Sequence, residues 1–453
     1  MCHPWLRFPA DSRAFTPCPH SAITRTGFLF FPRESTLIPA PPLVASFEHQ
    51  EEVFHQAFTI LRESIEQQVF PAASIAVTHH DHVIVLKGFG NIIPAGAPPF
   101  SRPLREGGDF DSPVTPATLF DVASLTKPIA TTTAAAILYE RGLLELDAPV
   151  IGVIPELLVD SCGEPDPRRP EITFRMLLAH SSGLPAYEKL FLRAHSRENL
   201  LVAAFTTPLS ADPATRTEYS DIGFILLGAA LERLAGEPLD IFCQREIFGP
   251  LAMTNTTFNP PQEMRSTIPP TADEREESAE EYGAGAFARN PLAPSQTPSG
   301  RRSTFRKRII QGEVQDENAF ILGGVAGHAG LFSSAEDLTR FAHAMLRGGS
   351  PILRPETVAL FTRRESAPTG TSRALGWDTP STPSQSGKHF EPRSYGHLGY
   401  TGTSLWIDPD RHLSITLLTN RTWPDCSNQA IKQIRPKFHD AVVEALPADK
   451  FRD

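Results

Sequence analysis

The stretch of sequence that decides the fold reads Asp121-Val122-Ala123-Ser124-Leu125-Thr126-Lys127-Pro128. It runs straight into an apolar segment, so we expect a helix from Ser124 to about Glu140, with Pro128 tolerated in its first turn. A serine and a lysine three residues apart at a helix start share one face, which brings the Lys127 ammonium within reach of the Ser124 hydroxyl. Free backbone amides and the helix dipole also favour a developing alkoxide there. Because chance places such a pair in many chains of this length, other elements must support it.

A second group of residues precedes an apolar helix predicted from Gly223 to Leu234. It reads Glu218-Tyr219-Ser220-Asp221-Ile222-Gly223. A phenol is a poor base at neutral pH because its ordinary pKa is about 10, but a neighbouring ammonium favours the phenolate. Tyr219 is therefore a candidate general base for a serine hydroxyl. The alternative is a structural tyrosine at a helix start, with its hydroxyl on the nearest carbonyl.

A third, glycine-rich group leads into a strand predicted from Thr403 to Ile407. It reads Tyr395-Gly396-His397-Leu398-Gly399-Tyr400-Thr401-Gly402-Thr403. Closely spaced glycines beside a strand let the backbone of a ligand approach, and a free amide there can complete an oxyanion hole with the Ser124 amide. The alternative is a tight turn that merely starts a hairpin.

In order and approximate spacing, the three groups resemble the Ser-x-x-Lys, Tyr-x-Asn and Lys-Thr-Gly motifs of the serine β-lactamase and penicillin-binding protein superfamily. Because its second motif contains a tyrosine, the chain resembles the class C β-lactamase branch, which includes D-alanyl-D-alanine peptidases and esterases. Residues 172–185 resemble the family's leucine-rich helix and His-x-Ser-Gly-Leu turn, and residues 312–319 and 323–333 resemble a segment common in this branch. The resemblance spans roughly residues 48 to 446. It implies an α/β (α+β) fold of the β-lactamase/transpeptidase type, with a central antiparallel sheet flanked by terminal helices and an inserted all-α subdomain.

The resemblance also implies a role for each site residue. Ser124 would form an acyl-enzyme, while Lys127 and Tyr219 share its proton and later activate the deacylating water. The backbone amides of Ser124 and Tyr400 would hold the carbonyl oxygen of the substrate, Tyr400 being the residue after Gly399 on the third-motif strand. The resemblance implies a reaction that needs no metal and no cofactor.

Two positions depart from the family pattern. Asp221 stands where asparagine is usual, and a carboxylate there would raise the pKa of Lys127 and cannot donate a hydrogen bond to a substrate. His397 stands where many members have lysine, and an imidazole is only partly cationic near neutral pH, so we expect a weaker, pH-dependent attraction for a substrate carboxylate. Both changes weaken the case for broad β-lactam hydrolysis. We interpret His180 and His328, which lie beside glycines, as structural.

The sequence therefore predicts a serine hydrolase that cleaves an ester, amide or β-lactam bond in a small-molecule or peptide substrate. Asp221 and His397 motivate one alternative, a penicillin-binding receptor-like protein that is acylated, or binds, without efficient turnover. The sequence leaves the physiological substrate and the oligomeric state open, because specificity lies in loops.

Composition and missing motifs exclude several other classes of protein. The net charge of −10 offers no cationic surface for nucleic acid, and no run of about 20 apolar residues could form a transmembrane helix. The cysteines are scattered and form no Cys-x-x-Cys pair, so neither a disulfide framework nor a zinc site is indicated. The turn His79-His80-Asp81-His82 gives no fixed geometry for a metal. The Gly-x-Ser-x-Gly elbow of an α/β-hydrolase does not occur in the sequence.

Hydrophobic spacing and turn residues predict the remaining elements. They are a helix on Phe54, Phe58, Leu61 and Ile65, a hairpin of residues 73–77 and 83–86, helices at 174–179 and 335–346, a strand at 413–419, and a closing helix on Ile431, Ile434, Phe438 and Val442. Pro436 should kink or restart that last helix.

Strands near both ends of the chain, with helices between them, imply a single catalytic domain of residues 48–446. Its sheet-containing lobe would comprise residues 48–120 and 350–446, and its mainly helical lobe residues 121–349. Residues 260–308, rich in Pro, Ser, Glu and Arg, are predicted to form a flexible insertion. Residues 447–453 would be a short tail.

Residues 1–47 are predicted to be a disordered tail, or to result from a start codon placed too far upstream. The apolar stretch from Phe28 to Phe31 is shorter than the roughly 7–15 residues of an export signal. The compartment therefore stays open, cytoplasmic by default and periplasmic or extracellular if the N-terminus is misplaced.

Overall fold

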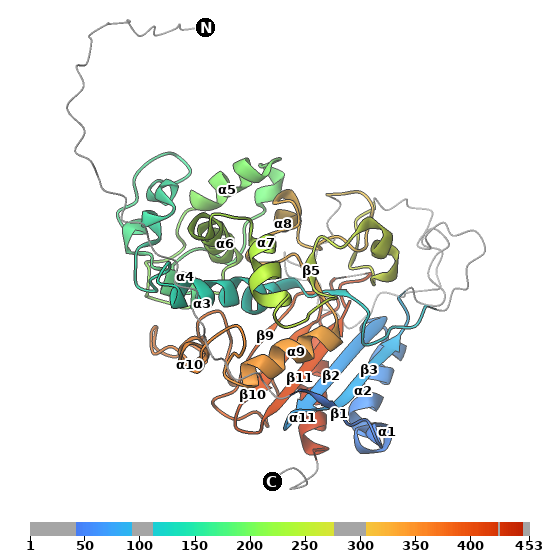
Figure 1. Ribbon diagram of the computed structural model, residues 1–453. Coiled ribbons are helices and arrows are strands. Elements are labelled where there is room, and N and C mark those ends of the chain that lie inside the picture. The colour runs from blue at the N-terminus through green and yellow to red at the C-terminus, as the bar shows by residue number, and fades with distance from the viewer. Residues whose placement is uncertain (1–41, 93–111, 276–304, 425, 447–453) are drawn as a thin grey trace, which may run out of the picture. The chain divides into compact units, whose positions relative to one another are not determined.

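A six-stranded sheet brings together both ends of the described chain (Figure 1). The computed structural model describes residues 42–92, 112–275, 305–424 and 426–446. The strands are β1 Val44–Ala45, β2 Ala72–His79, β3 His82–Gly90, β4 Phe120–Asp121, β5 Thr257–Phe258, β6 Ala272–Asp273, β7 Ile309–Ile310, β8 Leu331–Ser333, β9 Tyr395–Leu398, β10 Ser404–Asp408 and β11 Leu413–Thr419. The helices are α1 Gln50–Val53, α2 His55–Glu66, α3 Thr133–Glu140, α4 Phe174–Leu178, α5 Arg197–Phe205, α6 Asp221–Ala235, α7 Leu239–Cys243, α8 Glu317–Ile321, α9 Ala335–Leu346, α10 Pro355–Thr362 and α11 Ile431–Glu444.

The main sheet has the strand order β1-β3-β2-β11-β10-β9. β2 and β3 form the predicted hairpin, and β2 pairs antiparallel with β11, so that Ala73 lies opposite Thr419 and His79 opposite Leu413. At one edge, β1 runs parallel to β3. The sheet is therefore mixed, not antiparallel throughout as predicted. The helices α1 and α2 separate β1 from β2 in the chain, and a strand connected through helices is free to pair in parallel.

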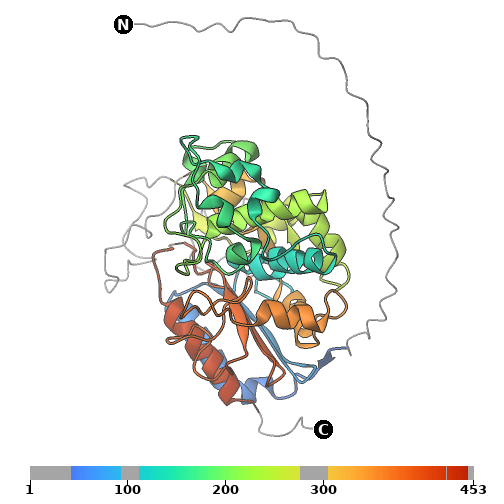
Figure 2. The same ribbon diagram turned by 90° about the vertical axis from the view of Figure 1, so that its left-hand side faces the viewer.

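Helices cover both faces of this sheet, α2 and α11 on one side and α9 on the other (Figure 2). Successive side chains of a strand point to opposite faces, and the two cores divide accordingly. Ile75 shares a buried cluster with Phe58 of α2 and Phe438 of α11. The next residue, Ala76, belongs instead to the larger cluster that contains Phe341 of α9. The sheet is thus buried on both faces.

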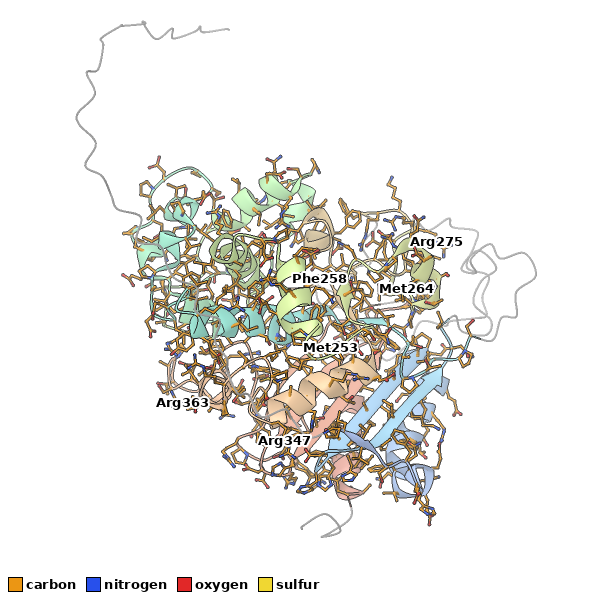
Figure 3. All side chains as sticks on the ribbon, viewed as in Figure 1. Met253, Phe258, Met264, Arg275, Arg347 and Arg363 are labelled. Carbon is orange, nitrogen blue, oxygen red and sulfur yellow. The ribbon has the colours of Figure 1, made fainter. Side chains whose placement is uncertain are left out.

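The helix α9 packs on the sheet, although the prediction for residues 121–349 placed it in the helical lobe. The chain just after α9 is tied to the hairpin of β2 and β3. Arg347, labelled in Figure 3, pairs with Asp81, and His343 Nδ1 lies 3.6 Å from Asp81 Oδ1. The amphipathic pattern predicted the bounds of α9, but such a pattern identifies a buried face and not the partner that covers it.

The helix α6 forms the centre of the helical lobe, where α3, α4, α5 and α7 pack around it (Figure 1). Ser220 caps its start by accepting a hydrogen bond from the Gly223 amide, and Gly236, with φ 73°, ends it. Its middle is buried on every side, as the continuous apolar sequence requires. The cap fixes the positions of Tyr219 and Asp221 at the start of this buried helix.

Part of the predicted flexible insertion, residues 260–308, is folded. Residues 262–267 form a 3-10 helix that includes Met264, labelled in Figure 3, and β6 pairs with β7. Glu274 and Arg306, with side chains 1% and 3% exposed, form an ion pair of 2.7 Å. The prediction was wrong for these residues because a polar composition conceals a buried ion pair. Residues 276–304 lie outside the described residues.

The last helix continues through Pro436, which was predicted to kink or restart it. A proline has no N–H, so the carbonyl of Lys432 loses its usual partner four residues along the helix. The side-chain amide of Gln385 donates to that carbonyl at 3.0 Å. This substitute hydrogen bond explains why the helix does not restart at Pro436.

All described residues belong to one compact unit. Most of the predicted tails, residues 1–41 and 447–453, lie outside the described residues, whereas residues 44–45 of the first predicted tail form β1. Within the described part of the chain, no helix has the length and apolar character needed to cross a membrane.

Replacing Glu274 by glutamine tests whether its segment is part of the folded core. The change leaves the buried Arg306 cation unpaired, which costs about 3–5 kcal/mol. We expect denaturant unfolding of Glu274→Gln to give a free energy of unfolding lower by about that amount. The control, Glu263→Gln, changes an exposed residue of the same segment. Equal free energies of unfolding for the two variants would contradict the buried ion pair.

Candidate active site

The nucleophile candidate Ser124 sits in a short 3-10 turn, Ala123–Leu125, directly after β4. Residues 127–132 then form a π-helical turn, and α3 begins at Thr133. The predicted regular helix from Ser124 to Glu140 is therefore wrong in its first half. In a regular α-helix the ring of Pro128 would clash with the Ser124 carbonyl four residues earlier, and a wider turn avoids that clash.

The 3-10 turn that carries Ser124 has an uncommon backbone conformation. Ala123 has φ 48°, and its amide donates to Asp121 Oδ1 at 2.8 Å. The other carboxylate oxygen of Asp121 accepts from the Gln315 amide at 2.7 Å. Burial raises the pKa of Asp121 to about 6, although these two amides oppose the shift. Within the stretch 121–138, Ser124 is the one residue that is not buried.

The structure brings three predicted site residues together around one oxygen atom. Ser124 Oγ lies 2.9 Å from Lys127 Nζ and 2.8 Å from the hydroxyl of Tyr219. Both are hydrogen-bond distances. Tyr219 is separated from Ser124 by 95 residues. The helix α6 therefore has to pack against the turn that carries Ser124, here called the nucleophile turn, to produce this contact.

Lys127 is fully buried and uses all three of its N–H donors. Besides Ser124 Oγ, it donates to Asp221 Oδ1 at 2.6 Å and to the carbonyl of His328 at 2.9 Å. Burial opposes the charge of Lys127, but the Asp221 carboxylate and Tyr219 outweigh it, and the pKa of Lys127 is raised. This is the direction predicted for an aspartate at position 221.

The pKa of Tyr219 moves against the prediction. Burial raises this pKa and Asp221 raises it further, which outweighs the lowering by the Lys127 ammonium. The ring of Tyr219 packs against that of His180, with 4.6 Å between centroids. His180 Nδ1 in turn accepts from the Ser220 amide at 3.0 Å. The resting phenol therefore keeps its proton and is held in place by its neighbours.

The third motif spans an edge strand and a turn. Gly396 to Leu398 lie on β9, whereas Tyr400 lies in the turn between β9 and β10, not on the strand as predicted. Two side chains fasten this turn to the chain before Ser124. Thr401 Oγ1 donates to the Asp121 carbonyl at 2.8 Å, and Thr403 Oγ1 to the Val122 carbonyl at 3.0 Å.

The turn also sets the direction of one backbone amide. The Gly399 carbonyl accepts from the Gly402 amide at 3.0 Å, and in a trans peptide the Tyr400 N–H points the opposite way. Among the described residues, the N–H groups of Ser124 and Tyr400 find no hydrogen-bond acceptor. Two unpaired amides are what an oxyanion hole requires.

His397 is neutral at neutral pH, which corrects the expectation of a partly cationic imidazole. Burial lowers its pKa well below the ordinary value, and the charges of Lys127 and Arg373 add to that effect. Its Nδ1–H donates to the Leu398 carbonyl at 2.8 Å, while its buried Nε2 has no partner in the described structure. The Nε2 atom is therefore a hydrogen-bond acceptor without a donor.

Arg373 lies at the site but was not predicted from the sequence. Its guanidinium carbon is 5.3 Å from the centroid of the Tyr219 ring. No motif marks this residue. Tertiary structure brings Arg373 to the site, because Asp378, a few residues later, exchanges two backbone hydrogen bonds of 2.8 and 2.9 Å with Gly396 of β9.

The sequence matches the beta-lactamase family over residues 57–435. This chain belongs to the beta-lactamase family. The family assignment confirms the predicted fold type and the class C-like resemblance. The protein is accordingly a serine hydrolase of the β-lactamase, D-alanyl peptidase and esterase type.

Two relatives cover most of this chain. The N-acetylmuramyl-L-alanine amidase of Bacillus subtilis (strain 168) is 35% identical over 321 residues, which are 67% of this chain and 68% of the relative. A provisionally assigned D-alanyl-D-alanine carboxypeptidase of Salmonella paratyphi A is 28% identical over 436 residues, which are 90% of this chain and 93% of the relative.

Two solved structures share the fold. EstCE1, a hydrolase with promiscuous acyltransferase activity, superposes with a TM-score of 0.64 at 20% identity, covering 88% of this chain and all of EstCE1. Simvastatin synthase (LovD) from Aspergillus terreus gives a TM-score of 0.61 at 19% identity, covering 86% of this chain and 98% of LovD. At these identities the likeness concerns the fold.

A side chain at position 399 tests the attachment of the third-motif turn. A Cβ there would lie 1.9 Å from Thr403 Oγ1 and 2.5 Å from the Val122 carbonyl, so Gly399→Ala has to displace the turn. Loss of one oxyanion donor lowers kcat by about 10²–10³-fold. We expect a loss of that order in hydrolysis of a nitrophenyl ester. The control Gly152→Ala has open space around its Cβ. Equal activity of the two variants would contradict this placement.

Proposed function

We propose that this protein hydrolyses an amide bond adjoining an alanine residue, through an acyl-enzyme formed on Ser124. The observation that carries the proposal is the position of Ser124 Oγ, within 2.9 Å of the Lys127 ammonium and 2.8 Å of the Tyr219 hydroxyl. A serine hydroxyl is a weak nucleophile until an adjacent group takes its proton, and these two groups are the ones in contact with it.

Acylation uses the contacts around Ser124. Its proton passes to the Lys127–Tyr219 pair once one of the two has lost its own proton, and Ser124 Oγ attacks the carbonyl carbon. The N–H groups of Ser124 and Tyr400 stabilise the resulting oxyanion. The carbon–nitrogen bond then breaks, and the leaving amine takes the proton held by the pair.

Deacylation repeats these steps with water. The Lys127–Tyr219 pair takes a proton from the water molecule, whose oxygen attacks the acyl carbon. The carbon–oxygen bond to Ser124 breaks, and the proton returns to the Ser124 oxygen. The net reaction converts one amide and one water molecule into a carboxylic acid and an amine, so atoms and charges balance.

The names of the two relatives favour an amide as the scissile bond. One relative is an amidase of N-acetylmuramyl-L-alanine and the other a provisionally assigned D-alanyl-D-alanine carboxypeptidase. Both names describe cleavage of an amide bond at an alanine. The neutral His397 adds support, because its unpaired Nε2 can accept a hydrogen bond from an N–H or O–H group of such a substrate.

Substitution of Ser124 by alanine tests the nucleophile. We expect Ser124→Ala to lose activity on N-acetylmuramyl-L-alanine, a D-alanyl-D-alanine peptide, a nitrophenyl ester and a chromogenic cephalosporin, while its melting temperature stays unchanged. In the wild type, hydrolysis of an alanyl amide supports the proposal. Turnover confined to the ester or the cephalosporin contradicts the choice of bond. Stable labelling by a fluorescent penicillin without product release would favour the receptor-like alternative.

Asp221→Asn tests the role of the Lys127–Asp221 ion pair in proton transfer. The Asp221 carboxylate raises the pKa of Lys127, and a base must be deprotonated to act, so the acid limb of the kcat/KM profile follows this pKa. Removing the carboxylate lowers the pKa of Lys127, and we expect the acid limb to move to lower pH. The control Asp212→Asn changes an exposed carboxylate. A limb that stays in place or moves to higher pH would contradict this role.

A further inference from the structure

The turn that carries the Tyr400 amide is held at two successive peptide groups. The first group joins Gly399 to Tyr400, and its carbonyl accepts from the Gly402 amide at 3.0 Å. The second joins Tyr400 to Thr401, and its carbonyl accepts from Arg421 Nε at 2.7 Å. Because a peptide group is planar, a contact with its carbonyl also orients its N–H. The two contacts together fix the backbone on both sides of Tyr400.

Arg421 approaches this turn from the middle of the main sheet. It lies just beyond the end of β11, the strand between β2 and β10 (Figure 1). Its amide donates to the Thr401 carbonyl at 2.9 Å, and its guanidinium carbon lies 4.5 Å from the centroid of the Tyr400 ring. A strand paired on both sides is a rigid support for a side chain, so Arg421 gives the turn a fixed point.

The stem of Arg421 packs closely against the turn because position 402 is a glycine. A Cβ there would lie 2.6 Å from Arg421 Cγ and 2.0 Å from Thr419 Oγ1. Gly402 also has φ 99°, a conformation that favours glycine. The backbone of the turn and the arginine stem therefore meet with no side chain of residue 402 between them.

The far end of the guanidinium is held as well. Arg421 Nη1 donates to the Cys426 carbonyl at 3.0 Å and to the Asn428 carbonyl at 3.2 Å. The side chain is buried, and a buried charge has to find hydrogen-bond acceptors in place of water. Contacts with carbonyls on two sides leave the guanidinium little freedom to move away from Tyr400.

We infer that Arg421 is a positioning residue for the oxyanion hole, because it holds the turn so that the Tyr400 N–H points at the developing oxyanion. Donors stabilise an oxyanion most when they are oriented before the reaction begins. Without the guanidinium, the peptide group after Tyr400 can rotate and carry the N–H out of place. The inference rests on the acyl-enzyme step of the proposed function, and it applies to an ester carbonyl as it does to an amide.

A pair of substrates that differ in one atom tests the inference. One is 4-nitrophenyl acetate, and the other is its thiono analogue, in which sulfur replaces the carbonyl oxygen. Sulfur is a weak hydrogen-bond acceptor, so correctly aimed N–H groups favour the oxygen substrate, and the ratio of the two kcat/KM values measures that preference.

Replacement of Arg421 by methionine removes the donors and keeps an unbranched, buried side chain. We expect Arg421→Met to lower kcat on the oxygen substrate by about 100-fold, the cost of a misplacement of about 1 Å. We also expect its ratio to fall toward the ratio for hydrolysis of the two esters by hydroxide ion in solution.

Arg169 provides a matched control. It too is a buried arginine that donates to backbone carbonyls, those of Leu157 at 3.1 Å, Phe205 at 2.9 Å and Thr207 at 2.7 Å. We expect Arg169→Met to lower the melting temperature, as Arg421→Met does, and to keep the wild-type ratio. A ratio that falls equally in both variants would reflect a general loss of packing and would overturn the inference.

Arg421→Lys is a second variant, which keeps the charge and most of the buried stem if the methionine variant does not fold. An ammonium is a point donor without the planar fork of a guanidinium, so it cannot reproduce all three contacts. We expect the ratio to fall part of the way. Either variant overturns the inference if it is folded by circular dichroism and keeps the wild-type ratio.

Failure of the proposed function gives a different result. Hydrolysis of the ester but of no alanyl amide contradicts the choice of bond and leaves the ratio test in place. If the ester is not hydrolysed either, the rate at which a fluorophosphonate labels Ser124 replaces the ratio, because its phosphoryl oxygen gains negative charge during the attack. We then expect slower labelling in Arg421→Met and unchanged labelling in Arg169→Met. A wild type that is not labelled at Ser124 contradicts both proposals.

Discussion

The site depends on one buried ammonium group. Lys127 has no exposed surface, and removing such an ion from water costs several kcal/mol. The protein replaces the lost water with three acceptors, Asp221 at the start of α6, the His328 carbonyl and the Ser124 hydroxyl, at 2.6 to 2.9 Å. Two of these acceptors come from distant segments, so burial of the lysine requires both to fold onto the nucleophile turn. The third is the oxygen atom on which we propose that the chemistry takes place.

Close backbone packing delivers the His328 carbonyl to this lysine. A Cβ at Gly327 would lie 2.2 Å from the Phe224 carbonyl, and a Cβ at Gly228 would lie 2.8 Å from the Gly327 amide. The loop before His328 therefore packs directly against α6. Thr131 Oγ1 donates a hydrogen bond of 2.6 Å to the Gly327 carbonyl in this loop. Because α6 begins with Asp221 and supports this loop on its side, one helix positions both distant acceptors of the ammonium.

The sequence could predict those features that depend on local spacing or on the motif pattern. Hydrophobic spacing and turn residues located β2, β11 and α9, and the three motifs identified Ser124, Lys127 and Tyr219, which the structure places in contact. The motifs said nothing about protonation. His397 is neutral and the pKa of Tyr219 is raised because both rings are buried, and burial depends on what the rest of the chain packs against them. Arg373 reaches the site only through the pairing of its segment with β9.

The cost of burying a charge explains both the neutral His397 and the position of the Arg373 cation. A lysine at position 397 would place a second ammonium in the buried surroundings of Lys127, where repulsion and desolvation both oppose it. The neutral imidazole avoids that cost and leaves the Lys127–Asp221 pair undisturbed. A guanidinium is more weakly hydrated than an ammonium, and that of Arg373 keeps part of its surface exposed. Its charge therefore loses less hydration than a second buried ammonium would, while the Lys127 ammonium stays in contact with Ser124.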